Sequence, residues 1–259
     1  MFLTTIIPLA YQLLQAYQSP GMSNEIATTV NMVSTPTPAP TTTQIVTNTS
    51  SDRTVTIGVL GDSMVTTLNE GMPQFALSLA KYYPHTKFNL LNYGASSTTI
   101  EQALDRLPQL INQKPDIIVI ESFAYNNYGN TQTGFDRQWT ALSNLTAEIK
   151  QKLPQTKIVL ATTISPNSVV FGNGIANLNL TSLDKIEKVK TIKLYLQNLI
   201  NFAQSQNYPL ADAYNLSLNQ DDGLINLISS TDHLHPSDEG KEVFCDTLAD
   251  TIAKNRLIE

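Results

Sequence analysis

The feature that most restricts the fold of this chain is a segment without a polar side chain, Ile117-Ile118-Val119-Ile120. A β-strand with one face in water alternates apolar and polar residues, whereas a strand that is covered on both faces is apolar throughout. Helices cover both faces of a sheet mainly where the strands are parallel, because each parallel connection crosses over one face. The segment therefore indicates an α/β protein with a parallel sheet.

Segments with strand character alternate with segments of helical character from residue 54 onwards. In one expected helix, residues 182–206, apolar residues recur with the 3.6-residue helical period. This alternation predicts a three-layer α/β/α sandwich around a five-stranded parallel sheet. The expected strands are residues 54–60, 87–92, 116–122, 157–163 and 208–212, and the expected helices are residues 69–83, 98–112, 136–153, 182–206 and 236–254.

The first 53 residues differ in composition from the rest of the chain. Residues 1–20 are mainly apolar, but a signal peptide begins with a positively charged region, and the first basic residue here is Arg53. The apolar run also falls short of the roughly 20 residues that cross a membrane. Three interpretations of residues 1–20 stay open: an atypical export signal, a remnant of a longer anchor, or a loosely docked tail.

Residues 21–53 form a region rich in proline and threonine, which predicts a disordered linker. Linkers of this kind often join an anchor to an exported domain, and a plain disordered tail is the alternative. We expect an exported or cell-surface-tethered protein whose N-terminus is the membrane tether. The folded domain is expected to span residues 54–259.

The overall composition argues against several classes of binding partner and metal site. The net charge of −6 and the isoelectric point near 5.0 argue against a nucleic-acid partner, which requires a basic surface. Cys245 is the only cysteine, so no internal disulfide can form and cysteine-rich metal sites are excluded. We expect a monomer that binds no metal ion and no organic cofactor.

A candidate nucleophile follows the first expected strand. Ser63 lies in the sequence Gly61-Asp62-Ser63-Met64, between residues 54–60 and an expected helix. A serine just past a strand end lies in a turn with backbone N–H groups nearby, which is where α/β folds place reacting groups. The tripeptide also occurs as a plain polar turn, so this interpretation depends on the presence of a base. For Asp62 we expect a structural role, in which its side chain accepts backbone hydrogen bonds.

The base is expected about 170 residues later, where two of the three histidines of the chain lie close together. His235 follows Asp232 by three residues and directly precedes a proline, so we expect His235 to be the base and His233 to be a loop residue or a substrate contact. Ser63 would attack an ester carbonyl, His235 would take its proton and later protonate the leaving alcohol, and Asp232 would hold the imidazole tautomer.

The tetrahedral oxyanion of such a reaction needs preorganised hydrogen-bond donors. The ends of the first three expected strands offer the N–H of Ser63, the N–H of Gly94 and the side-chain amide of Asn126. Asn127 is an alternative to Asn126. Glu121, at the end of the third strand, is expected to be either a partner of these groups or a polar strand end.

These segments resemble the SGNH, or GDSL-type, hydrolase superfamily. Gly61-Asp62-Ser63 matches its first block, Asn92-Tyr93-Gly94 its second, and the segment from Asp232 to Pro236 its fifth. The third block is usually Gly-x-Asn-Asp and reads Ala124-Tyr125-Asn126-Asn127 here, and the fifth more often has glycine where His233 stands. The resemblance covers residues 54–259 and implies a flavodoxin-like strand order.

The resemblance implies a serine ester hydrolase that removes small, acetyl-like acyl groups from carbohydrate or lipid esters. The expected substrate is a small-molecule or polysaccharide ester. Two alternatives stay open: an O-acyltransferase with the same triad, and a catalytically silent glycan-binding module. Trp139, Tyr125 and Tyr128 are candidates for lining a substrate pocket, and residues 165–181 for a mobile cover.

Overall fold

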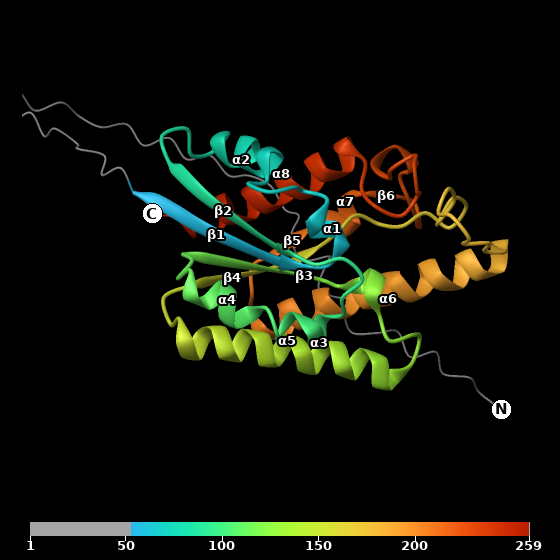
Figure 1. Cartoon of the computed structure of the whole chain (residues 1–259), viewed down its shortest axis with the longest axis horizontal. Helices are drawn as coiled ribbons and strands as arrows, with labels where there is room; N and C mark the ends of the chain where they lie inside the picture. The colour runs from blue at the N-terminus through green and yellow to red at the C-terminus, as the bar shows by residue number, and fades with distance from the viewer. Residues whose placement is uncertain (1–52, 259) are drawn as a thin grey trace, which may run out of the picture. The chain divides into compact units, whose positions relative to one another are not determined.

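The computed structural model of the protein describes residues 53–258, which Figure 1 shows as a layered α/β domain. Residues 1–20 and almost all of the expected linker lie outside the described residues, so both expectations stay predictions. None of the helices between residues 53 and 258 is long and apolar enough to cross a membrane.

Five parallel strands form the central sheet, in the order β2-β1-β3-β4-β5. This flavodoxin-like order confirms the expected fold. It places β1 between β2 and β3, so the loops that follow these three strands meet at one edge of the sheet. The strands are β1 (Thr54–Gly61), β2 (Lys87–Gly94), β3 (Ile117–Glu121), β4 (Lys157–Thr162) and β5 (Leu210–Asp212).

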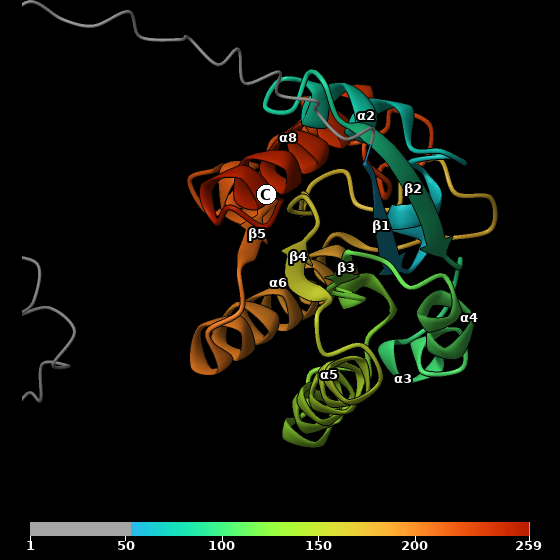
Figure 2. The same cartoon turned by 90° about the vertical axis from the view of Figure 1, so that its left-hand side faces the viewer.

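Helices cover both faces of the sheet, as the apolar strand β3 predicts. Ile117 and Val119 pack with α2 (Pro73–Ala80) and α8 (Asp238–Lys254) on one face. Ile118 and Ile120 pack on the other face with four helices, and Figure 2 shows the two helical layers on opposite sides of the strands. The four are α3 (Ile100–Ala103), α4 (Leu107–Asn112), α5 (Gln132–Lys152) and α6 (Ser182–Gln206).

Short elements complete the edge of the sheet at which the strands end. They include a 3₁₀ turn after β3 and a small hairpin that precedes the last helix. The short elements are α1 (Ser63–Thr66), the 3₁₀ turn η2 (Ala124–Asn126), α7 (Ala213–Leu216), β6 (Leu218–Asn219), β7 (Asp222–Gly223) and the 3₁₀ turn η3 (Ile225–Leu227).

Four expected helices differ in their bounds. The one expected over residues 136–153 is α5, which begins at Gln132 because Thr131 caps it by accepting the N–H of Gly134. The one expected from residue 69 begins only at Pro73, because Asn69 and Met72 have left-handed backbone conformations. The helix expected over residues 98–112 is divided into α3 and α4, and Pro108 lies in the first turn of α4, where its missing N–H is tolerated. The last helix begins after Pro236 rather than with it, because Ser237 caps it by accepting the N–H of Gly240.

Candidate active site

Ser63 is the first residue of α1, directly after the buried end of β1. The Asp62 side chain caps this short helix by accepting the N–H of Met64 at 2.9 Å, which confirms its expected structural role. Glycine at position 61 allows β1 to lead directly into α1, because a Cβ atom there would lie 2.2 Å from the side chain of Val65. Within residues 53–258 the N–H of Ser63 has no acceptor, so it stays available to a ligand.

Asp232 and His235 lie in the loop before α8 and are joined by a hydrogen bond of 2.8 Å between Oδ2 and Nδ1. The other carboxylate oxygen accepts the N–H groups of Leu234 and His235. Burial opposes ionisation of Asp232, but the hydrogen bonds from His235 and from the two N–H groups outweigh it and lower the pKa of Asp232. Because an ionised carboxylate only accepts, Nδ1 of His235 carries the hydrogen and Nε2 is left as the basic nitrogen.

The loops of Ser63 and His235 lie beside each other at the ends of β1 and β4. Met64 and Pro236, which directly follow the two residues, line the same small cavity. His235 also lies close enough to Asp62 that an imidazolium at His235 would favour the ionised form of the Asp62 carboxyl. The described part of the chain contains no hydrogen bond between Ser63 Oγ and His235, and such catalytic contacts often tighten only when substrate is bound.

Asn126 ends the 3₁₀ turn η2 and points towards the Ser63 loop. Its Nδ2 donates to Oδ2 of Asp62 at 2.8 Å, which uses one of its two N–H groups. The side chain of Asn127 is instead bonded within its own loop, to the carbonyl of Ala124 and the N–H of Gly129. The geometry therefore favours Asn126 over Asn127 at the site.

The expected oxyanion donor Gly94 is already engaged. Its N–H donates to Oδ1 of Asn92 at 2.8 Å, and a Cβ atom at Gly94 would lie 2.5 Å from the backbone nitrogen of Thr66. Gly94 thus allows β2 to approach the Ser63 helix closely, and its N–H is not free in this structure, which argues against the expected role.

A residue that the sequence did not single out lies in the same loop. Ser97 has a left-handed backbone with φ of 59°, and among the described residues its N–H has no acceptor. The loop is fixed near Ser63 because the N–H of Ala95 donates to the carbonyl of Gly61. A run of small polar residues after β2 was the only sequence signal for this N–H.

Glu121 is fully buried behind the site, and it is a partner of the site loop rather than a polar strand end. Its carboxyl accepts the hydroxyl of Ser122 at 2.5 Å and the N–H of Phe123 at 2.9 Å. Burial, reinforced by the nearby charge of Asp62, raises the pKa of Glu121 to about 8. Burial also raises the pKa of Asp62, which hydrogen bonds from Met64 and Asn126 partly offset. At neutral pH the Glu121 carboxyl therefore keeps its proton.

A cleft of about 690 Å³ opens beside Asn126. Its walls come from the loop after η2, from residues 171–178, from α6 and from Leu234, which precedes His235. The wall combines apolar side chains, including Phe171, Ile175 and Leu178, with polar and charged ones from the loop after η2 and from α6. Tyr125 is among the lining residues, whereas Trp139 packs edge-on against Phe202 in the core and Tyr128 stacks under Arg137.

The expected cover, residues 165–181, is tied to the triad loop. The carbonyl of His233 accepts the N–H of Gly172, and Nδ1 of His233 bonds the carbonyl of Asn173 at 2.9 Å. His233 has a left-handed backbone with φ of 49°, the conformation that glycine adopts most easily. This explains why a glycine fits that position in the resembling family, and it makes His233 a loop residue rather than the base.

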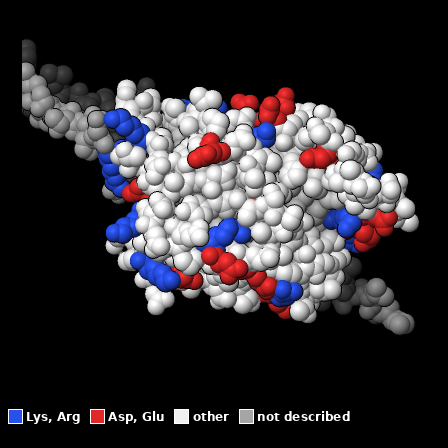
Figure 3. Space-filling view, viewed as in Figure 1, with Lys and Arg blue, Asp and Glu red and all other residues white. Residues whose placement is uncertain are grey.

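Charged side chains gather at the opposite end of the domain from the site. Figure 3 shows basic side chains where β1 begins, at the left of the view. There Arg53, Lys114, Lys152, Lys157 and Arg256 surround Asp116 in a shallow cleft. Among residues 53–258 there is no group of histidine, cysteine and acidic side chains that could hold a metal ion.

Comparison with known proteins decides the family. A family model described as the GDSL-like lipase/acylhydrolase family matches residues 59–243, a span that contains Ser63, Asp232 and His235. The chain belongs to this family. It is a carboxylic ester hydrolase of the SGNH/GDSL type, which confirms the resemblance seen in the sequence blocks.

Solved structures of other ester-cleaving enzymes share the fold at low sequence identity. A lipase/acylhydrolase from Enterococcus faecalis is 18% identical with a TM-score of 0.56, covering 78% of this chain and 96% of its own. A catalytic mutant of an acetylxylan esterase from Geobacillus stearothermophilus is 18% identical with a TM-score of 0.55, covering 76% and 94%. A GDSL-like lipase from Bacteroides thetaiotaomicron is 15% identical with a TM-score of 0.53, covering 77% and 88%. No curated protein matches the chain.

Proposed function

We propose that this GDSL-type hydrolase cleaves esters through an acyl-enzyme on Ser63. Ser63 Oγ bonds to the ester carbonyl carbon while Nε2 of His235 takes its proton. The bond to the alcohol then breaks, and the same proton passes to the leaving alcohol oxygen. Water, activated by His235, attacks the acyl-enzyme, releases the acid and restores Ser63.

The observation that carries this proposal is the hydrogen bond of 2.8 Å between Asp232 and His235. It fixes the tautomer that leaves Nε2 basic, and it stabilises the imidazolium that forms when the proton moves. The acetylxylan esterase of similar fold gives support, because its serine-to-alanine and aspartate-to-alanine exchanges are both described as catalytic mutants.

We assign the oxyanion to three donors: the N–H of Ser63, the second N–H of the Asn126 amide, and the N–H of Ser97. We propose Ser97 instead of the expected Gly94, because the Gly94 N–H already donates to Oδ1 of Asn92. Each such donor contributes about 10²- to 10³-fold to the rate in hydrolases that have been dissected by mutation.

For the substrate we propose small, acetyl-like acyl groups on a carbohydrate or lipid alcohol. The same triad would serve O-acyl transfer if a sugar hydroxyl replaced water, and a silent glycan-binding module is the remaining alternative. We also propose surface tethering through residues 1–53. The chain enters the domain at the start of β1, and this eight-residue strand separates that point from Ser63 by roughly 26 Å at the usual rise per residue.

The test is hydrolysis of p-nitrophenyl acetate through decanoate by the wild type, Ser63→Ala and His235→Ala. Loss of the nucleophile or base costs roughly 10⁶ in kcat in a dissected serine protease, so both variants should fall to background. A fluorophosphonate should label the wild type and not Ser63→Ala. Turnover that survives Ser63→Ala would refute the acyl-enzyme.

An acceptor assay separates hydrolysis from transfer. The enzyme is given an activated acyl donor together with a neutral oligosaccharide, and both free acid and acylated sugar are measured. Free acid alone supports the hydrolase, whereas acylated sugar as the main product supports the transferase. A wild type that is inert towards every ester and towards the fluorophosphonate would favour the silent binding module.

A further inference from the structure

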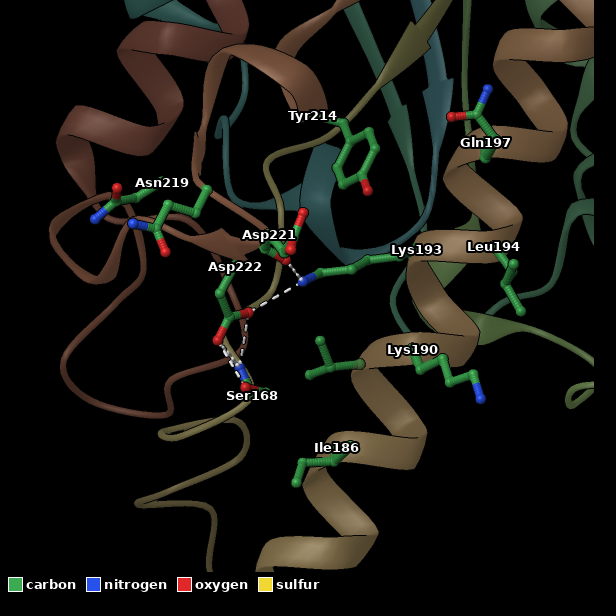
Figure 4. Close-up of a pocket in the computed structure, with 12 residues that line it drawn as sticks. Ser168, Ile186, Lys190, Lys193, Leu194, Gln197, Tyr214, Asn219, Asp221 and Asp222 are labelled. Atoms are coloured by element: carbon green, nitrogen blue, oxygen red, sulfur yellow. Dashed lines mark hydrogen bonds and ion pairs between the residues drawn. The ribbon is translucent and has the colours of Figure 1, made fainter. Parts of the chain in front are cut away.

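A second cleft, of about 600 Å³, lies between α6 and the β6–β7 hairpin, away from Ser63 and His235. Figure 4 shows Lys193 extending from α6 towards the hairpin, with the ring of Tyr214 above it. The cleft lies on the other side of α6 from the one beside Asn126. Lys190 and Lys193 face this cleft, whereas Lys188 and Thr191 face the other.

The floor of this cleft is held rigidly by an ion pair. Lys193 donates to the carbonyl of Asp221 and pairs with Oδ1 of Asp222 at 3.1 Å. Asp222 also accepts the N–H and the hydroxyl of Ser168, the latter at 2.6 Å. Burial opposes ionisation of Asp222, but these hydrogen bonds outweigh it and lower its pKa. The charge of Lys193 is therefore already compensated and does not attract an anionic ligand.

Polar groups without a hydrogen-bond partner line the cleft on both of its walls. In the described part of the chain, the Tyr214 hydroxyl, the Asn219 and Gln220 amides, the Asp221 carboxylate and the Lys190 ammonium make no hydrogen bond. Lys190 and Asp221 have opposite charges, so the unpaired groups carry no net charge. They offer donors and acceptors in nearly equal measure, which suits a neutral ligand with many hydroxyl groups.

The remaining lining is apolar and partly exposed. Ile186 and Leu194 on α6 are 47% and 39% exposed, and the Tyr214 ring is half-buried at the opposite wall. A pyranose ring presents hydroxyls at its edge and C–H groups on its faces. A cleft that combines an aromatic ring, aliphatic side chains and a few unpaired amides matches both parts of such a ring.

We propose that this cleft is a second ligand site that binds a neutral saccharide. It is separate from the ester site, because the diameter of α6, on the order of 10 Å, lies between the two clefts. The saccharide bound there would hold a glycan next to the enzyme without occupying the position of the ester. The proposal does not require that hydrolysis at Ser63 occurs.

The test is isothermal titration calorimetry of the wild-type protein, after fluorophosphonate treatment, with xylotetraose, cellotetraose, mannotetraose and N-acetylchitotetraose. Treatment blocks Ser63, and the variants below assign the remaining binding to the second cleft. We expect at least one of the four to bind at millimolar concentration or below. Binding should weaken at least about tenfold in the double variant Asn219→Ala/Gln220→Ala, which changes only exposed side chains of the β6–β7 hairpin.

Three further variants make the result specific. Tyr214→Phe should weaken binding through loss of its hydroxyl, while keeping the ring that packs against the core. Tyr82→Ala, an exposed tyrosine on the opposite helical layer, should bind as the wild type does. Ser63→Ala, which the fluorophosphonate does not label, should also retain binding if it is titrated untreated.

Two outcomes would overturn the proposal: none of the four saccharides binds, or the double variant binds as tightly as the wild type. Binding of inorganic phosphate in their place would also overturn it, because that would make the cleft an anion site. Hydrolysis of p-nitrophenyl acetate is measured in parallel and should be unchanged in the double variant. If the wild type does not hydrolyse any ester, the proposed function is refuted, but the proposal of a saccharide site is not affected.

Discussion

Asp62 Oδ2 accepts a hydrogen bond of 2.8 Å from Asn126 Nδ2, and this bond joins two segments 64 residues apart. One segment carries the candidate nucleophile, and the other carries a candidate oxyanion donor. Since the Asp62 carboxylate is completely buried, its position is fixed by the N–H of Met64 and by this amide. Asp62 thereby sets the direction in which the second N–H of Asn126 points.

The substitution Asp62→Asn should lower kcat because it reorients the side-chain amide of Asn126. The new amide can keep the bond to Met64, but its NH₂ group then faces the NH₂ group of Asn126, and two donors repel. We expect kcat to fall about 10²-fold with KM little changed, which is the size expected for one lost oxyanion donor. Asn126→Ala should lose a similar factor, and the double variant should lose little more. Additive losses would show that Asp62 does not act through Asn126.

Glu121→Gln should change the pH dependence of stability. The pKa of Glu121 is about 8 in the folded protein against 4.5 as the ordinary value, so the folded state holds a proton that the unfolded state releases. The contribution of this group to stability is therefore present below pH 4.5 and falls as pH rises to about 8, by up to roughly 1.4 kcal/mol per pH unit. Glutamine cannot ionise and removes this loss.

Thermal unfolding between pH 5 and pH 9 measures the effect. The wild type should lose stability towards alkaline pH more steeply than Glu121→Gln does. Glu148→Gln is a suitable control, since Glu148 pairs with Lys152 on the surface and lies far from the buried carboxyls. Parallel curves for the wild type and Glu121→Gln would contradict the buried, protonated state of Glu121.

The fold and the pairing of Asp232 with His235 could be predicted from the sequence because both depend on local patterns. Apolar runs such as Ile117–Ile120 reveal buried parallel strands, and the segment from Asp232 to His235 contains its hydrogen bond within four residues. The bond from Asp62 to Asn126 could not be read, because it depends on how two distant loops meet. The hydrogen bond from the Gly94 N–H to the Asn92 side chain, on which our proposal of Ser97 rests, could not be predicted either, because no residue type reveals it.

His233→Gly should loosen residues 171–175 without disturbing the triad. Glycine adopts the left-handed backbone at this position with less strain than histidine. This gain of on the order of 1 kcal/mol offsets the stability that is lost with the side-chain hydrogen bond. The bond from Nδ1 to the Asn173 carbonyl disappears, so that of the two bonds from His233 to the wall only the one from the Gly172 N–H to the His233 carbonyl is left. Hydrogen exchange should accelerate in residues 171–175 while the melting temperature changes little. Unchanged exchange would show that the side chain of His233 does not hold the loop.

The cleft beside Asn126 should determine how large an ester the enzyme accepts. Leu178 lines this cleft and is 37% exposed, so Leu178→Glu places a charge on the wall without opening the core. Desolvating that carboxylate would penalise long apolar chains, while an acetyl group is too short to reach the wall. We expect kcat/KM for p-nitrophenyl octanoate to fall about tenfold or more, with acetate unchanged.

Leu183→Glu is the matched control, because Leu183 is 74% exposed at the start of α6 and lines neither cleft. Phenyl and naphthyl acetates test whether the cleft instead holds the alcohol part of the ester. If Leu178→Glu lowers kcat/KM for these two esters but not for the octanoate, the cleft holds the alcohol. An equal loss on acetate, octanoate and the aryl acetates would mean that Leu178 affects the site only through the fold.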